Sequence, residues 1–129
     1  MLRNYSGWNS TDFAAFQQYM IDQYAGTNQY FLYYKHGTYP DHYWSNWTQS
    51  NVASLMAIGV LCDDQALYDL GVDYWKGIAI PEDGSGSENI ENSVTFRHPS
   101  GLGQWQESGR DQAHTLMGPQ LTGPICEIA

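Results

Sequence analysis

The stretch SNVASLMAIGVLCDDQALYDLGVDYWKG, residues 50–77, decides the fold, because it carries two apolar helical stripes with a short link between them. The stripe of its first half consists of Val52, Leu55, Met56 and Gly59. The stripe of its second half consists of Leu67, Leu70, Gly71, Tyr74 and Trp75. Since only two or three residues link the two halves, they are expected to pack side by side. The stretch therefore predicts an antiparallel helical hairpin.

The ends of the predicted helices carry stop and start signals. The second helix of the hairpin is expected to start at Asp63 or Asp64 and to end at Gly77. Upstream, apolar residues at helical spacing predict a helix over Thr11–Tyr24, which Gly26 is expected to end. A short helix over residues 28–35 and then a loop are expected to follow.

The chain changes character after the hairpin. Residues 78–103 are rich in Gly, Pro, Ser and Asn and predict a long loop, with one short strand within NSVTFRH, residues 92–98. From Glu107 to Ala129 the sequence again favours a helix. Pro119 and Pro124 each remove a backbone donor there and are expected to kink or break it. The whole pattern predicts an all-α fold with a long Gly/Pro-rich loop.

The charge of the chain argues against several kinds of partner. Its 129 residues carry a formal net charge of −9. Nucleic-acid binding requires a basic stripe, and anionic lipid disfavours an acidic surface. No apolar run reaches the roughly 18 residues of a membrane-spanning helix. We therefore expect neither a nucleic-acid nor a membrane partner.

Two residue types leave alternatives open. Aromatic residues make up 15% of the chain, and Tyr and Trp suit sugars because a ring can stack on a sugar while its polar tip hydrogen-bonds hydroxyl groups. The same rings can also simply fill a core. The two cysteines, Cys62 and Cys126, can form a disulfide or remain as two buried free thiols.

The segment QESGRDQAH, residues 106–114, concentrates groups that can bind charge and transfer protons. Glu107, Arg110, Asp111 and His114 are spaced i, i+3, i+4 and i+7, so a helix would place them on one face. An imidazole titrates near neutral pH, and a guanidinium can hold a carboxylate in a bidentate pair. The segment is thus a candidate active site, and its alternative is a solvated ladder of salt bridges.

Three stretches in this order and spacing, SNWTQSNVASLMAIGV, DDQALYDLGVDYWKG and GQWQESGRDQAHTLMG, resemble the alginate-lyase-like domain of polysaccharide lyases with an (α/α) toroid fold. The likeness runs from about Ser45 to Ala129, and residues 1–44 fit more loosely as a preceding hairpin. It implies that residues 1–129 form part of a toroid of antiparallel helical hairpins. It also implies a secreted protein, whose signal peptide lies upstream of this chain, that needs no cofactor.

The resemblance also implies an activity, the β-elimination of an acidic, uronic-acid-containing polysaccharide of the alginate or glucuronan type. Enzymes with this fold usually place an Asn, a His, an Arg and a Tyr in a central cleft. By position, Asn46 matches the Asn that contacts the substrate carboxylate, while Trp47 stands where many relatives have His. The candidate catalytic residues are His114 as base, Arg110 and Glu107, and the candidate substrate-binding residues are Asn46, Trp47, Gln104 and Gln112. We expect Asn46, Trp47, Glu107, Arg110 and His114 to converge on one concave surface.

The expected Tyr is missing from the second motif, where Ala113 occupies its place in some relatives. Tyr34, Tyr39 and Tyr43 are the candidate substitutes. With this gap and an incomplete toroid, we expect the isolated chain to be weakly active or inactive.

Three other interpretations are weaker. The chain can be a non-catalytic carbohydrate-binding domain on the same scaffold, or a glycoside hydrolase that pairs Glu107 with Asp41. A metal could bind His36, Asp41 and His42, but their spacing matches no familiar ligand pattern. We therefore expect no metal site.

Overall fold

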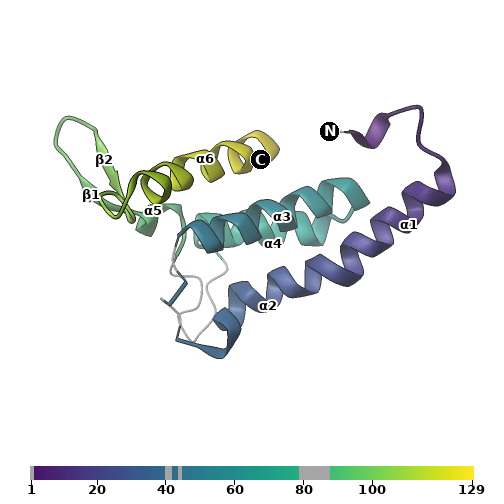
Figure 1. Cartoon of the computed structure of the whole chain (residues 1–129), viewed down its shortest axis with the longest axis horizontal. Coiled ribbons are helices and arrows are strands. Elements are labelled where there is room, and N and C mark those ends of the chain that lie inside the picture. The colour runs from purple at the N-terminus through teal and green to yellow at the C-terminus, as the bar shows by residue number, and fades with distance from the viewer. Residues whose placement is uncertain (1, 40–41, 44, 79–87) are drawn as a thin grey trace.

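A computed structural model describes residues 2–39, 42–43, 45–78 and 88–129, and it is predominantly helical with one small two-stranded sheet (Figure 1). The predicted all-α class is confirmed. Helix α3, Asn46–Cys62, lies at the centre and packs against α4, α6 and α2. The core comprises Ala25, Phe31, Leu32, Val52, Leu55, Met56, Ile58, Leu67, Tyr74, Trp75 and Ile125. That these hairpins form part of a toroid, as the resemblance implies, stays a prediction.

The predicted hairpin is confirmed as α3 followed by α4, Gln65–Lys76. The link adopts a left-handed conformation at Asp63, with φ 56°, and the side chain of Asp64 then caps α4 by accepting a hydrogen bond from Leu67 N at 3.0 Å. Gly77, with φ 73°, ends α4 as predicted. The second helix thus begins one residue after the predicted start, because Asp64 serves as its cap.

Close packing within the hairpin depends on Gly59. A Cβ atom added at Gly59 would lie 2.7 Å from Tyr68 N and 2.9 Å from Asp64 O, which are backbone atoms that cannot move aside. We expect Gly59→Ala to lower the free energy of unfolding by about 1–3 kcal/mol, as measured by urea titration. Gly26→Ala is the matched control, because its Cβ would meet nothing within 4 Å. That control should be neutral or raise the free energy by about 0.5–1 kcal/mol, and equal losses in both variants would contradict the packing argument.

The predicted stop at Gly26 is wrong. Helix α1, Ser10–Met20, continues through a π-helical turn, Ile21–Ala25, into α2, Gly26–Tyr34. Gly26 itself has helical angles, φ −63° and ψ −38°. Apolar burial on both sides of Gly26 keeps the helix going, with Ala25 before it and Phe31 after it. The helix ends instead at Lys35 and His36, whose φ angles are 46° and 57°.

The segment after the hairpin contains short regular elements. The predicted strand is confirmed as β1, Val94–Arg97, which follows a one-turn helix α5, Ile90–Ser93. It pairs in antiparallel fashion with β2, Gly103–Trp105, a strand that we did not predict. Within the predicted long loop, residues 79–87 lie outside the described part of the chain.

Helix α6, Gln112–Ile128, starts five residues later than predicted and is not broken by its prolines. Pro119 and Pro124 both lie on its exposed face, where water can satisfy the carbonyl groups that lose a backbone partner. The opposite face holds the helix together, since it buries Gly118 and Ile125. The expectation of a broken helix is therefore wrong.

The two cysteines are free. Cys62 is half-buried, and burial raises the pKa of its thiol. Cys126 is exposed on α6, so neither the disulfide nor the pair of buried thiols describes the chain.

Candidate active site at the start of helices α3 and α6

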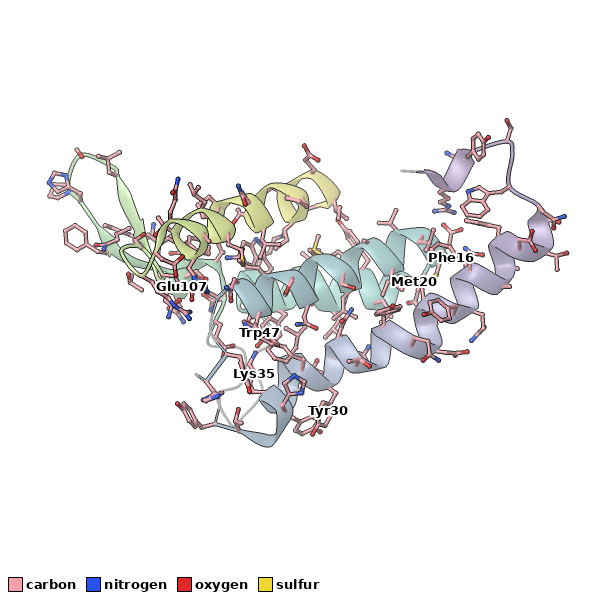
Figure 2. All side chains as sticks on the ribbon, in the orientation of Figure 1. Phe16, Met20, Tyr30, Lys35, Trp47 and Glu107 are labelled. Atoms are coloured by element: carbon pink, nitrogen blue, oxygen red, sulfur yellow. The ribbon has the colours of Figure 1, made fainter. Side chains whose placement is uncertain are left out.

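A pocket of about 350 Å³ lies between the start of α3 and the turn that precedes α6. Its lining residues are His42, Tyr43, Asn46, Trp47, Gln106, Glu107 and Arg110. Figure 2 shows two of them, Trp47 and Glu107, at the end of the molecule where α3 begins. Four of the five residues that were expected to converge therefore line one hollow, and His114 is not among the lining residues.

The start of α3 fixes Asn46 in this pocket. The residue before it, Ser45, adopts φ 64° and ψ −87°, an unusual conformation for a residue with a side chain. The Asn46 side chain accepts a hydrogen bond from Trp47 N at 2.7 Å and donates one to Met117 Sδ of α6 at 3.3 Å. Only 6% of Asn46 is exposed. Its amide is therefore held in one orientation at the junction of α3 and α6.

The turn before α6 supplies a charged pair. Arg110 Nη1 lies 2.8 Å from Glu107 Oε1, with the Glu107 side chain buried and the Arg110 side chain exposed. The other oxygen of Glu107, Oε2, is buried without a hydrogen-bond partner among the described residues. The predicted helical face across this segment is wrong, because Glu107 and Arg110 lie in the turn and the helix begins only at Gln112. The turn nevertheless brings both side chains to the pocket.

His114 lies in the first turn of α6 and contacts Asp111. The Asp111 side chain caps α6 by accepting a hydrogen bond from His114 N at 2.9 Å, and its Oδ2 lies 2.5 Å from His114 Nδ1. Hydrogen bonds from the His114 backbone and ring hold the pKa of Asp111 below its ordinary value. His114 precedes Met117 by three residues and so shares a face of α6 with the side chain that contacts Asn46. His114 therefore lies outside the pocket lining, on the face of α6 that carries Met117.

The other predicted substrate-binding residues lie apart from the pocket lining. Gln104 is exposed in β2, opposite Phe96, and Gln112 is exposed as the first residue of α6. Asp41, which the hydrolase and metal interpretations need, lies outside the described residues. Among the residues that the structure describes, no cluster of His, Cys, Asp or Glu could hold a metal ion.

Aromatic rings form one wall of the pocket. The Tyr43 ring lies 5.0 Å from the Trp47 ring and 4.4 Å from the His42 ring, measured between centroids. Trp47 also stacks on buried Phe31 and is itself 49% exposed, so its ring is supported by neighbours and still open to solvent. A supported, half-exposed indole is a suitable surface for a sugar ring.

The prediction from the sequence named His42 only as a possible metal ligand and did not name Gln106. It named Tyr43 as a candidate but could not place it in a cleft. One sequence signal for these residues exists. His42 and Tyr43 lie just before Asn46, and Gln106 lies directly before Glu107. Residues next to the start of a helix lie beside its first turn, and both helices start here.

The two helix starts also bring two helix N-termini to the same end of an acidic protein. Figure 1 shows that α3 and α6 both begin at the end of the molecule that carries the β hairpin, and the two helices pack against each other. The N-terminus of a helix carries about half a positive charge. Two carboxylates lie near these positive groups, since Glu107 pairs with Arg110 and Asp111 caps α6.

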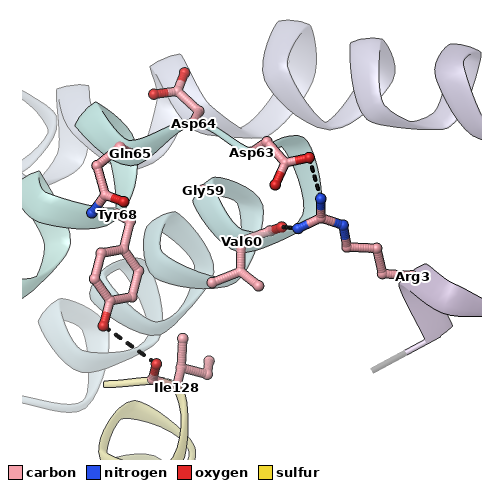
Figure 3. Close-up of a pocket in the computed structure, with 8 residues that line it drawn as sticks. All are labelled: Arg3, Gly59, Val60, Asp63, Asp64, Gln65, Tyr68 and Ile128. Atoms are coloured by element: carbon pink, nitrogen blue, oxygen red, sulfur yellow. Dashed lines mark hydrogen bonds and ion pairs between the residues drawn. The ribbon is translucent and has the colours of Figure 1, made fainter.

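A second hollow, of about 360 Å³, lies at the opposite end of the α3–α4 hairpin (Figure 3). There the Arg3 guanidinium donates to Val60 O at 2.8 Å and contacts Asp63, so its charge is already neutralised. Asp64 also lines this hollow. Because the charge that remains is negative, an acidic polymer is disfavoured there, and none of the predicted site residues is present.

Comparison with known proteins gives one match. The model of the family described as alginate lyase matches residues 1–92. The matched region includes Asn46 and the α3–α4 hairpin, and it also includes residues 1–44, which we had fitted only loosely. It does not include residues 93–129, where the QESGRDQAH motif lies. No curated protein and no solved structure matches the chain. Within the described residues, no helix has the length and apolar character needed to cross a membrane.

Proposed function

The chain belongs to the alginate lyase family, and on that premise we propose that it cleaves a uronic-acid-containing polysaccharide by β-elimination. Family membership itself implies a polysaccharide substrate and a lyase-like activity. The observation that supports a uronate in particular is the pocket, which combines Arg110, Asn46 and the N-terminus of α3 around a space of about 350 Å³. We further propose that the protein acts outside the cell, where such polymers occur.

The elimination needs one anionic group to be held and two protons to be transferred. A base removes the proton at C5 of the uronate, the electron pair forms the C4–C5 double bond, and the C4–O bond breaks. An acid then gives a proton to the departing glycosidic oxygen. Binding of the C5 carboxylate by cationic and hydrogen-bonding groups stabilises the charge that develops when the C5 proton leaves.

We assign carboxylate binding to Arg110 and Asn46. The exposed Arg110 guanidinium can form a bidentate pair with a carboxylate, and Asn46 lies within the same lining. Glu107 holds Arg110 in place through its Oε1. The four side-chain types that the resemblance expects in the cleft are all represented in this lining, as Asn46, His42, Arg110 and Tyr43.

We assign proton transfer to His114 as the base and Tyr43 as the acid. His114 remains our choice from the sequence, because Asp111 engages its Nδ1 and leaves Nε2 available. His114 lies outside the pocket lining, but a polymer would extend beyond the pocket. His42 is the second candidate base, since it lines the pocket and touches the Tyr43 ring. Trp47 is assigned to stacking against a sugar ring.

The function is tested by incubating the purified chain with alginate and with glucuronan, and with a neutral glucan as control. A lyase generates an unsaturated uronate end that absorbs ultraviolet light, so absorbance should rise with the two uronans, slowly because the isolated chain is expected to be only weakly active, and not with the glucan. Reducing ends that appear without this absorbance would indicate a hydrolase instead. Binding of a uronan with no new ends at all would favour the non-catalytic binding domain, for which the half-exposed ring of Trp47 is the supporting observation.

Arg110 gives a sharp test of carboxylate binding. A hydrogen bond to a charged group contributes about 1.5–3 kcal/mol, so Arg110→Ala should lower kcat/KM on a uronan by about 10–100-fold. Arg97→Ala is the matched control, because Arg97 is also exposed and also paired with a glutamate, Glu91, but lies in β1 outside the pocket lining. An equal loss in both variants would mean that general charge, rather than the pocket, attracts the polymer.

A further inference from the structure

We propose that Asp111 is a positioning residue that holds the His114 ring with its proton on Nδ1 and its lone pair on Nε2. This inference rests on the proposed function in one respect: the lone pair on Nε2 is what His114 needs if it acts as the base. In the structure it is Asp111 that contacts the ring, while Glu107 is engaged with Arg110.

The Asp111 carboxylate is fixed by two contacts to the same residue. Oδ1 accepts a hydrogen bond from His114 N at 2.9 Å, and Oδ2 lies 2.5 Å from His114 Nδ1. The first contact anchors the carboxylate to the first turn of α6, and the second anchors the ring to the carboxylate. The ring is therefore oriented by the same group that caps the helix.

The chemistry of the contact decides the tautomer. An ionised carboxylate only accepts hydrogen bonds, so Nδ1 of the neutral ring must carry the proton and Nε2 must carry the lone pair. Asp111 also lies at the N-terminus of α6, which favours its ionised form. When Nε2 takes a proton from a substrate, the adjacent carboxylate stabilises the imidazolium that results.

A second histidine provides an internal reference with the opposite arrangement. Ser100 N donates a hydrogen bond to Nδ1 of His98 at 3.1 Å, and that ring also contacts Ser100 Oγ at 2.7 Å. A backbone N–H can only donate, so Nδ1 of neutral His98 is the acceptor and Nε2 carries the proton. The structure thus assigns opposite tautomers to two histidines of one chain.

Capping alone would be a simpler role for Asp111, and two variants separate the roles. Asn is as good a helix cap as Asp, so Asp111→Asn retains the cap. Its amide can, however, donate a hydrogen bond to Nδ1 and so favour the other tautomer, with the proton on Nε2. Asp111→Ala loses both the cap and the contact to the ring.

The experiment is ¹⁵N NMR of the histidine rings in the full chain, together with uronan cleavage. Wild-type His114 should give the Nδ1–H signature and His98 the Nε2–H signature. Asp111→Asn should change the signature of His114 but not of His98, and it should lower kcat by about 10–100-fold with little change in helix content. Asp111→Ala should lower kcat as well and should also reduce thermal stability.

Several results would overturn the proposal. An Nε2–H signature for His114 in the wild type would do so, and this result does not depend on any variant folding. An unchanged His114 signature, or unchanged kcat, in a folded Asp111→Asn variant would do so as well. If the tautomers are as assigned but the wild type produces no unsaturated ends, the positioning role stands and the proposed lyase function fails.

Discussion

Replacing Glu88 by Gln is expected to lower the free energy of unfolding by about 3–5 kcal/mol, because it removes the charge of a buried carboxylate that pairs with the buried Lys35 ammonium. Lys35 Nζ lies 3.3 Å from Glu88 Oε2, and the two side chains are 1% and 0% exposed. Gln has nearly the shape of Glu, so the loss reports the charge rather than a cavity. For a small domain whose total stability is about 5–15 kcal/mol, this is a large fraction.

The pair belongs to a network that joins four parts of the chain. Lys35 Nζ donates to Tyr74 Oη at 3.0 Å and to Thr48 Oγ1 at 3.3 Å, and Tyr74 Oη lies 2.9 Å from Glu88 Oε2. Lys35 ends α2, Thr48 lies in the first turn of α3, and Tyr74 lies in α4. The network therefore fixes the end of α2 against the start of α3, and the segment between them carries the pocket residues His42 and Tyr43.

Glu91→Gln is the matched control, three residues along the same segment. Glu91 pairs with Arg97 at 2.6 Å, but both side chains are largely exposed, so solvent screens the pair and its loss should change stability little. Urea titrations of both variants at neutral pH make the comparison. Similar small losses in the two variants would show that the charge of Glu88 contributes little to the network.

Prediction from the sequence was most accurate where one helical spacing of apolar residues accounted for many positions. The α3–α4 hairpin followed from two apolar stripes, and its ends followed from Asp64 and Gly77. Local signals failed where tertiary burial opposed them. Gly26 lies within a helix because its neighbours are buried on both sides, and Pro119 and Pro124 lie within α6 because their lost hydrogen bonds face solvent.

The candidate site was predictable only in part, for a related reason. Glu107 and Arg110 reach the pocket from a turn, although the argument for them assumed a helix. His42 reaches it from a segment without regular periodicity, and such a segment has no sequence rule that gives the direction of a side chain. The buried Lys35–Glu88 pair was likewise missed, since residues 53 positions apart in sequence meet only through tertiary structure.

His114→Ala is expected to lower kcat on a uronan by about 10²–10⁴-fold, the usual effect of removing a group that transfers a proton. Folding should be nearly unaffected, because the side chain is partly exposed and the cap that Asp111 provides to the His114 backbone N–H survives. KM should change little, since Arg110 and Asn46, which we propose to bind the carboxylate, remain in place. Product formation is followed through the absorbance of the unsaturated end.

Two further histidine variants decide whether His114 is the base. His98→Ala is the control, because His98 is exposed in the segment that joins β1 to β2 and lies outside the pocket lining, so its kcat should equal that of the wild type. His42→Ala removes a ring that does line the pocket and packs on Tyr43, so it should raise KM more than it lowers kcat. The reverse result, a collapse of kcat in His42→Ala with normal kcat in His114→Ala, would move the base to His42. It would also leave the Asp111–His114 contact with a structural role only, because a positioned imidazole contributes to catalysis only where its free nitrogen meets the substrate.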